Sequence, residues 1–320
     1  MTYALGIDIG GTKIAIGIMN SDNEMLCTDS FLIEGMTAIS IFVKMQDTIE
    51  ELVREAGLKK DDISSIGIGV PGIINKDRRS VLFAPNIPLL NDFPLYRSLR
   101  NMFPDASIVL ENDANAAGLA ESILGAGKNF DNMIYCTIST GVGAGIIIDH
   151  KLFRGSHLAA GEIGHMITFP DGEPCGCGNR GCAEAYAGGA NYPKYIRHVI
   201  DSGRETILKD YLETHGTIDG RALSFGLDNH DALAEEVFSK ICRTIGILFF
   251  NLYKCLNIDC YVLGGGLTNL GDKLFTGIEE NFQKLRVGAD TMEKVYFLPA
   301  HFTSNEIGVY GAALVALENR

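Results

Sequence analysis

The feature that most constrains the fold is a pattern of strand, glycine turn and strand that occurs twice in the chain. The first copy is Leu5–Asn20 (LGIDIGGTKIAIGIMN), in which a Gly-Gly-Thr turn joins two β-rich runs, and the second is Tyr135–Asp149 (YCTISTGVGAGIIID). Gly10 and Gly141 occupy the same place in the two copies and lie 131 positions apart. That separation is too long for a solenoid repeat and suits a duplicated domain, so we expect two similar halves.

The segments around these two copies alternate between helical and extended patterns. Apolar residues three and four positions apart predict a helix over residues 42–56, which Gly57 ends, and a longer helix over 231–256. The other predicted elements are strands over 63–70, 108–110 and 259–263, helices over 116–124 and from about 305 to 316, and an irregular loop over 84–93. Strands that alternate with helices in this way predict an α/β fold.

The length and the charge of the chain limit its size class and its partners. With 320 residues, the chain is long enough for about two domains. Its net charge of −13 repels nucleic acids and anionic membrane surfaces, so neither is expected as a partner. The longest apolar stretch, Gly246–Tyr253, is far shorter than the ~20 residues that cross a bilayer, and Met1–Asp8 lacks the basic start of a signal peptide. We therefore expect a cytoplasmic protein.

Three glycine turns, each placed after an apolar strand, indicate a nucleotide site. They lie in Asp8–Lys13 (DIGGTK), Ser139–Gly145 (STGVGAG) and Gly264–Gly266. Glycines let backbone amides approach an anion, and Asp8 is placed to hold Mg²⁺. A plain hairpin turn is the alternative for any one of them, whereas three such turns favour a nucleotide bound from both halves. The candidate residues are Asp8, Gly10, Gly11, Thr12, Lys13, Thr140, Gly141 and Gly265.

A fourth glycine pattern, Gly67–Gly72 (GIGVPG), matches the dinucleotide fingerprint G-x-G-x-x-G. Pro71 lies inside it, and the polar turn that follows lacks the helical pattern whose N-terminus would bind a pyrophosphate. We therefore expect no dinucleotide at this position.

One histidine and three cysteines are spaced as metal ligands. Gly161–His165 (GEIGH) precedes Cys175–Cys182 (CGCGNRGC), and this donor set suits tetrahedral Zn²⁺. Free loop cysteines are the alternative. Because the protein would fill all four positions, we expect a structural Zn²⁺ that also fixes the nearby carboxylates Glu162 and Glu184. The expected ligands are His165, Cys175, Cys177 and Cys182.

Acid and amide side chains gather in Glu111–Asn115 (ENDAN), where a strand turns into a helix. Asn112 and Asp113 are suited to binding sugar hydroxyls, and Asp113 is suited to accepting the proton of an attacking hydroxyl. Helix capping is the alternative, because Asn and Asp are good capping residues. The pentapeptide alone leaves the two interpretations even.

Taken in order, these motifs resemble the signature of the ROK family of sugar kinases and sugar-responsive repressors. The resemblance covers about Leu5–Ala316, and its cysteine pattern is specific. It implies an actin-like, hexokinase-type fold with two ribonuclease-H-like domains around a cleft. The implied domain limits are 1–118, to which the last helix (305–320) returns, and 119–304, which carries the zinc loop.

The resemblance also implies a reaction and its residues. A sugar hydroxyl, the primary one at C6, would attack the γ-phosphate of ATP in the presence of Mg²⁺, with Asp113 as the base. His165 would serve the zinc through one ring nitrogen and the sugar through the other. A homodimer is implied as well. The family's sugar contacts fall on Asn86, Asn112, Asp113, Glu162, His165 and Glu184.

Three questions stay open in the sequence. A non-catalytic sugar sensor is the alternative to a kinase, although the seven residues before Asp8 leave no room for the helix-turn-helix of ROK repressors. The hexose is D-allose or D-glucose, with N-acetylmannosamine, N-acetylglucosamine and fructose behind them. Glucokinases of the family carry a tryptophan soon after a Pro-Asn-Leu loop, whereas this chain has no Trp and its segments Asn75–Arg79 and Pro85–Leu89 look more like the D-allose kinases. Lys128, Arg154 and Arg180 either contact phosphate or hold loops, and the sequence offers no basis for choosing.

Overall fold

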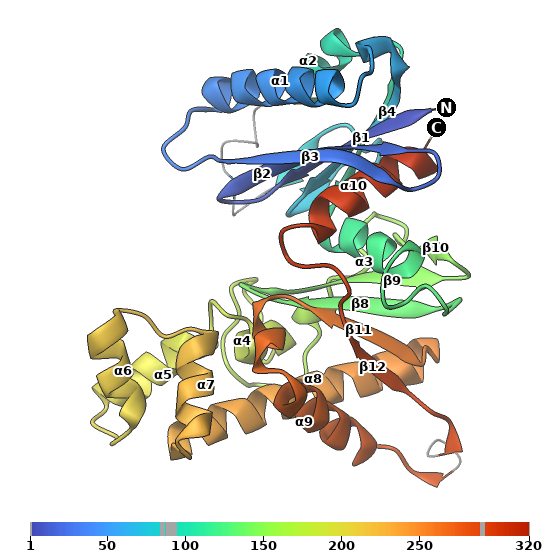
Figure 1. Cartoon of the computed structure of the whole chain (residues 1–320). Helices are drawn as coiled ribbons and strands as arrows, with labels where there is room; N and C mark the ends of the chain where they lie inside the picture. Colours follow the sequence, from blue (N-terminus) through green and yellow to red (C-terminus); the bar gives the residue numbers. More distant parts are fainter. Residues whose placement is uncertain (1, 84–86, 88–94, 289–291, 320) are drawn as a thin grey trace. The chain divides into compact units, whose positions relative to one another are not determined.

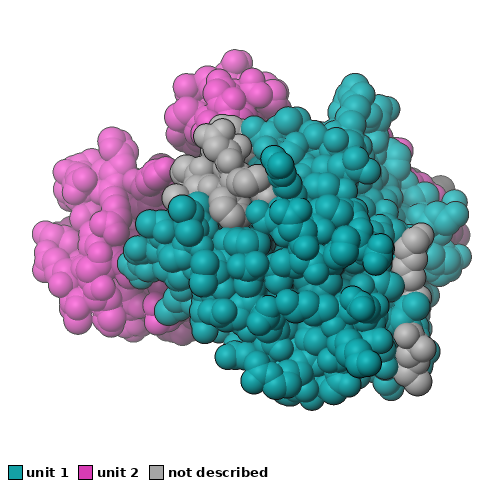
Figure 2. All heavy atoms as spheres, turned by 90° about the horizontal axis from the view of Figure 1, so that it is seen from above, with its two compact units in different colours: residues 1–131, 145–161, 301–320 teal, residues 132–144, 162–300 magenta. Residues whose placement is uncertain are grey.

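The computed structural model describes residues 2–83, 87, 95–288 and 292–319 (Figure 1). The contacts between residues divide the chain into two compact units, which Figure 2 distinguishes by colour. Unit 1 comprises residues 1–131, 145–161 and 301–320, and unit 2 comprises residues 132–144 and 162–300. The domain limits expected from the sequence, 1–118 with 305–320 and 119–304, stay a prediction.

Unit 1 is built on a mixed five-stranded sheet with the strand order β3-β2-β1-β4-β7. β1 and β2 form the hairpin around the first glycine turn, β3 extends it in antiparallel fashion, and β4 and β7 run parallel to β1. β4 confirms the strand predicted over 63–70, and β7 extends the one predicted over 108–110. The bounds are β1 (Tyr3–Ile9), β2 (Lys13–Asn20), β3 (Met25–Leu32), β4 (Ile63–Val70) and β7 (Ser107–Asn112).

A second five-stranded sheet follows the order β10-β9-β8-β11-β12. β8 and β9 flank the second glycine turn as β1 and β2 flank the first, and β11 runs parallel to β8 as β4 runs parallel to β1. Each sheet therefore repeats one topology, which confirms the two similar halves predicted from the duplicated motif. The bounds are β8 (Met133–Ile138), β9 (Val142–Ile148), β10 (Lys151–Leu152), β11 (Cys260–Gly264) and β12 (Tyr296–Pro299).

Helices cover both faces of the first sheet (Figure 1). α1 packs on β2 and β3, whereas α10, the last helix, packs on β1 and β4 and against α3. α1 begins with a capping box between Thr37 and Ser40 and is followed by Gly57 at φ +68°. Ile41 lies on its buried face, whereas Phe42, the first residue of the predicted helix, is only partly buried. The bounds are α1 (Ala38–Glu55), α2 (Leu95–Met102), α3 (Asp113–Ile123) and α10 (Ile307–Glu318).

The helices of unit 2 are dominated by α8, which confirms the long helix predicted over 231–256. Asp231 caps it by accepting hydrogen bonds from the amides of Leu233 and Ala234, and Asn257 ends it in the left-handed conformation. The bounds are α4 (Ala183–Ala187), α5 (Tyr192–Asp201), α6 (Ile207–His215), α7 (Gly220–Asp228), α8 (Ala232–Leu256) and α9 (Asp272–Gln283).

The close approach of α10 to the first sheet explains the glycine pattern at residues 67–72. A Cβ atom at Gly67 would lie 2.0 Å from the carbonyl oxygen of Ala312, and one at Gly6 would lie 2.6 Å from the amide nitrogen of Ala313. Both glycines therefore provide room for the backbone of α10, and this part of the chain is a packing surface. The packing of α10 therefore accounts for the glycine at position 67 without a dinucleotide site.

A short hairpin, β5 (Ile73–Ile74) and β6 (Val81–Phe83), encloses the polar turn at residues 75–80. The irregular loop predicted over 84–93 lies outside the described residues, apart from the buried Ile87. Within the described part of the chain, no helix is both long and apolar enough to cross a membrane. The cytoplasmic location and the homodimer stay predictions.

The packing of α10 on the sheet can be tested by adding one methyl group at Gly67. We expect Gly67→Ala to lower the free energy of unfolding by about 2 kcal/mol or more, because the new Cβ meets backbone that cannot move aside. Urea denaturation followed by circular dichroism measures this. Gly220→Ala is the control, since the nearest atoms would lie 3.9 Å away, and it should leave stability unchanged or slightly higher. Equal stability of the two variants would refute the close approach.

Candidate functional site

Two carboxylates, Asp8 and Asp113, lie at one edge of the first sheet. Because β1, β4 and β7 run parallel, their carboxyl ends share that edge, with Asp8 opposite Gly69 and Gly69 opposite Glu111. Asp8 is next to the end of β1, and Asp113 is the first residue of α3 directly after β7. Gly69 between them has no side chain, and a Cβ atom there would lie 3.5 Å from Asp8 Oδ1.

The environment of Asp8 disfavours its charged form. Burial, and after it the negative charge of Asp113, raise the pKa of Asp8 to about 7, although the Lys13 ammonium acts in the opposite direction. The start of α10 lies directly against this side chain, because a Cβ at Gly308 would be 2.2 Å from Asp8 Oδ2. A divalent cation would relieve the repulsion between the two carboxylates, which makes oxygen ligands of this kind suitable for Mg²⁺.

The first glycine turn is a tight hairpin at the same edge. The amide of Gly10 donates to the carbonyl of Lys13 at 2.9 Å, and Gly11 and Thr12 are exposed between them. Lys13 Nζ donates to Asn305 Oδ1 at 2.9 Å, in the segment that leads into α10. The same turn can be both a hairpin and a binding site for an anion, because its exposed backbone is accessible to a ligand. Nucleotide binding by these residues stays a prediction.

Asn112 is the N-cap of α3. Its Oδ1 accepts hydrogen bonds from the amides of Ala114 (2.9 Å) and Asn115 (3.2 Å), and its Nδ2 donates to the carbonyl of Gly72 at 3.3 Å. The helix therefore begins at Asp113, three residues before the predicted start. Asp113 Oδ1 accepts from the amide of Ala114 at 2.9 Å. Capping is thus observed for Asn112, and the sugar contacts of both residues stay predictions.

In unit 2, the second and third glycine turns meet. Gly265, at φ +89°, lies against the end of β8, where an added Cβ would be 2.5 Å from the carbonyl oxygen of Ile138. Thr140 and Gly141 come after Ser139, the next residue of the chain, and the carbonyl of Thr140 accepts a hydrogen bond from the amide of Ala190 at 2.9 Å. Three of the predicted nucleotide residues, Thr140, Gly141 and Gly265, therefore lie together.

Glu184 connects this glycine turn to the cysteine loop. Its Oε2 accepts a hydrogen bond from the amide of Val142 at 2.9 Å, and a Cβ at Gly141 would be 2.5 Å from the same oxygen. Glu184 is in α4, which begins immediately after Cys182. A predicted sugar ligand, a predicted nucleotide turn and a predicted metal ligand are therefore neighbours within unit 2.

The predicted metal ligands form one cluster. The donor atoms of His165, Cys175, Cys177 and Cys182 lie within 4.8 Å of one another. His165 Nδ1 is 3.7 Å from Cys175 Sγ, and Cys177 Sγ is 3.7 Å from Cys182 Sγ. Burial, followed by its contacts with the other two thiols, raises the pKa of Cys182 to about 12. Three thiols and one imidazole in this arrangement fit a tetrahedral Zn²⁺, which would stabilise the thiolates.

The two ring nitrogens of His165 face different partners. While Nδ1 faces the thiol of Cys175, Nε2 is 3.9 Å from Glu162 Oε2, and the Glu162 side chain is half exposed. One nitrogen is thus available to a metal and the other to a ligand, as the sequence resemblance implies. Asn86, the remaining predicted sugar contact, lies outside the described residues.

Three charged residues form a cluster beside the start of α3. Glu111 is fully buried and pairs with Arg78 and Arg154. Arg154 therefore helps to hold structure together, and its contact with phosphate stays a prediction. The sequence could have indicated Glu111, because a glutamate at the end of an apolar strand is unusual. It offered no such indication for Arg78 beyond the place of this residue in a polar turn.

Comparison with known proteins agrees with this architecture. The model of the ROK family matches residues 4–319. A glucokinase of Streptomyces griseus, solved in complex with glucose and AMPPNP, superposes with a TM-score of 0.78 at 31% identity, over 99% of each chain. The fold is the actin-like ATPase fold of the ROK hexokinases. The chain belongs to the ROK family, as its motifs predicted.

Curated relatives of different specificity match over almost the whole chain. A glucokinase of Streptomyces coelicolor is 33% identical over 99% of this chain and 98% of its own. An N-acetylmannosamine kinase of Yersinia pestis is 31% identical over 99% of both. The two are similar to this chain to nearly the same degree, so family membership leaves the sugar open.

The raised pKa of Asp8 predicts a pH-dependent loss of stability. A carboxyl whose folded pKa lies above its unfolded value of about 3.8 binds more protons in the folded state, so stability falls as pH rises from about 4 to 7 and then levels off. Relative to Asp8→Asn, the parent protein should therefore lose on the order of 1 kcal/mol or more between pH 4.5 and 8 in EDTA. Urea unfolding at several pH values measures this.

Asp47→Asn, on the exposed side of α1, is the control for this titration. Its stability should follow that of the parent at every pH. Parallel curves for the parent and Asp8→Asn would show that Asp8 does not titrate in this range.

Proposed function

We propose that this protein is an ATP-dependent sugar kinase that transfers the γ-phosphoryl group to the C6 hydroxyl of an aldohexose. The observation that carries the proposal is the pair Asp8 and Asp113 at the same sheet edge, beside Gly69. One carboxylate is placed to hold a cation and the other to take a proton, which is the division of labour that phosphoryl transfer to a hydroxyl requires. Membership of the ROK family supports it.

Asp113 is the base in this proposal. It accepts the proton of the attacking hydroxyl, and the amide of Ala114 holds one of its oxygens. Asp8 would hold Mg²⁺, which would supply positive charge to offset the charge of the phosphates. Backbone amides of the glycine turns bind the phosphates, so most of the catalysis is positioning. The proposed nucleotide contacts are Asp8, Gly10, Gly11, Thr12, Lys13, Thr140, Gly141 and Gly265.

The sugar is D-glucose or D-allose, which differ only in the orientation of the C3 hydroxyl. A single hydrogen bond to that hydroxyl is enough for discrimination. The similarity to two glucokinases favours glucose, whereas the sequence of the Asn75–Arg79 turn favours allose. The proposed sugar contacts are Asn86, Asn112, Asp113, Glu162, His165 and Glu184.

A structural Zn²⁺ is part of the proposal. Four protein ligands leave no open coordination position, so the metal would hold the loop and would not generate hydroxide. Through His165, which faces both the thiols and Glu162, and through α4, which begins after Cys182, the metal would fix carboxylates proposed to bind the sugar.

The kinase proposal is tested by ADP release from ATP and Mg²⁺ with a panel of sugars. We expect turnover with D-glucose or D-allose, and a loss of at least about 100-fold in Asp113→Asn, which keeps the size of the side chain but cannot accept the proton. The panel also contains D-mannose, D-fructose, N-acetylmannosamine and N-acetylglucosamine. Asp105→Asn, at an exposed position of the same unit, should keep full activity.

Each outcome of the panel has a distinct meaning. Turnover only with an N-acetylated sugar would support the proposed kinase activity and contradict the proposed substrate. Binding of a sugar without turnover, in folded protein, would replace the kinase by a sugar sensor. Full activity of Asp113→Asn would remove Asp113 from its role as the base.

The zinc proposal predicts a stoichiometry and a stability effect. Elemental analysis should find about one Zn²⁺ per chain in the parent and none in Cys182→Ser. Removal of the metal should lower the free energy of unfolding by about 3 kcal/mol or more, because metal binding stabilises only the folded loop. Cys255→Ser, at an exposed position outside the cluster, should retain the metal. A Cys182→Ser variant that retains a full equivalent would contradict the proposed ligand set.

A further inference from the structure

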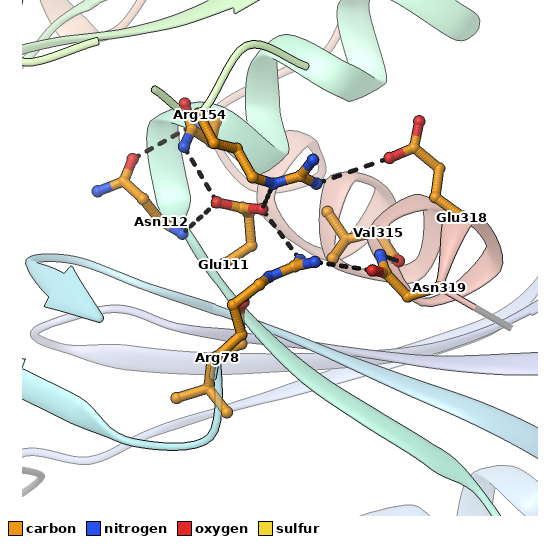
Figure 3. Close-up of polar contacts among 9 residues, drawn as sticks. Arg78, Glu111, Asn112, Arg154, Val315, Glu318 and Asn319 are labelled. Atoms are coloured by element: carbon orange, nitrogen blue, oxygen red, sulfur yellow. Dashed lines mark hydrogen bonds and ion pairs between the residues drawn. The ribbon is translucent and has the colours of Figure 1, made fainter. Parts of the chain in front are cut away.

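Glu111, the residue before the Asn112 cap, is a charged group without any exposure to solvent. Figure 3 shows it between the side chains of Arg78 and Arg154. Its two oxygens have separate tasks. Oε1 accepts hydrogen bonds from the amide of Asn112 (3.1 Å) and from Asn115 Nδ2 (3.0 Å). Oε2 accepts from Arg78 Nη2 (3.0 Å) and Arg154 Nε (2.6 Å). Four donors use the acceptor capacity of a carboxylate fully.

The two arginines approach Glu111 from distant parts of the chain. Arg78 belongs to the polar turn between β5 and β6, and Arg154 follows β10. Arg78 also donates through Nε to the carbonyl of Leu110 (3.0 Å) and through Nη1 to Asn319 Oδ1 (2.7 Å). Since the amide of Leu110 donates to the carbonyl of Arg78 at 2.9 Å, this turn is fastened to the end of β7 from both sides.

The C-terminal end of α10 and Asn319 after it complete the arrangement (Figure 3). Asn319 accepts from Arg78 and donates to the carbonyl of Val315, while Arg154 Nη2 lies 3.7 Å from Glu318 Oε2. The four charged groups are two guanidiniums and two carboxylates, so the cluster can be neutral. A cluster without net charge fixes the backbone and adds little long-range electrostatic potential.

The two residues that donate hydrogen bonds to Glu111 Oε1 lie on either side of Asp113 in the sequence. Asn112 precedes Asp113 and Asn115 follows it in the first turn of α3, and the same oxygen of Glu111 accepts from both. The start of the helix is thereby tied to the strand that precedes it. Small displacements of a reacting group have large effects on rate, because the attacking and accepting atoms must be within hydrogen-bond reach.

We infer that Glu111, held between Arg78 and Arg154, is a positioning residue that sets the direction of the Asp113 carboxylate. The expected effect on kcat rests on the proposed function, whereas the tie between Glu111 and the start of α3 rests on the structure alone. Glu111 touches no substrate in this account and acts through the backbone on either side of Asp113.

The test is Glu111→Gln, which keeps the shape of the side chain but loses its charge and places an amide N–H against arginine donors. We expect kcat to fall between about 10-fold and 100-fold, while the KM for ATP changes less than about twofold, because the nucleotide turns are separate from this cluster. Steady-state kinetics with the sugar that the parent protein uses measure both values.

Glu121→Gln is the matched control. Glu121 is also fully buried and belongs to α3, and its oxygens accept from the amides of Ala126 (2.8 Å) and Phe302 (3.0 Å). Both variants remove one buried charge from the same helix, so both should lose stability. Only Glu111→Gln should lose kcat. A similar loss in both variants, or in neither, would overturn the inference.

A second measurement does not depend on catalysis. Amide hydrogen exchange over residues 112–116 should be faster by about 10-fold or more in Glu111→Gln than in Glu121→Gln. If the parent protein has no kinase activity but this difference is found, the proposed function fails and the positioning of the helix start stands. If exchange is the same in both variants, the positioning role is contradicted, whatever the kinetics.

Discussion

The close contact of α10 with the first sheet and with α3 is the constraint on which the rest of unit 1 depends. Gly6 and Gly67 admit its backbone on one side, and a Cβ at Gly311 would lie 2.2 Å from the carbonyl oxygen of Ala116 on the other. Because the last helix of the chain packs on its first strand, unit 1 is complete only when both ends of the chain have been placed. The same helix brings Gly308 against Asp8 and Asn319 to Arg78, so its packing sets the position of both electrostatic centres at the sheet edge.

These two centres are built in opposite ways. Glu111 is buried with a full set of donors and two cationic partners, and such a group fixes structure because any displacement leaves a buried charge unpaired. Asp8 faces a second carboxylate, and its pKa is raised to about 7 mainly by burial. Repulsion of that kind persists in a fold when a ligand relieves it, and perturbed carboxylates in such places are typical of functional sites. We therefore assign a structural role to Glu111 and a role in the reaction to the pair Asp8 and Asp113.

Much of the fold was predictable because its signals are local. The duplicated glycine turn predicted two halves of one topology, and the spacing of His165 and the cysteines predicted a cluster that the structure brings together. The role of Glu111 was not predictable, because its partners lie 33 and 43 residues away and no local pattern announces them. Asn112 shows a different limit. Capping and ligand binding call for the same residue type at the start of a helix, and the sequence cannot separate them.

In the proposed reaction, phosphate passes from ATP to a sugar and not to water. Phosphorus NMR of a reaction containing ATP, Mg²⁺ and D-glucose or D-allose distinguishes the two acceptors. We expect a sugar phosphomonoester resonance that grows in equal amount with ADP, and its coupling to the C6 protons would identify the hydroxyl. Inorganic phosphate in place of the ester, or unchanged ATP beside a sugar that binds, would contradict it.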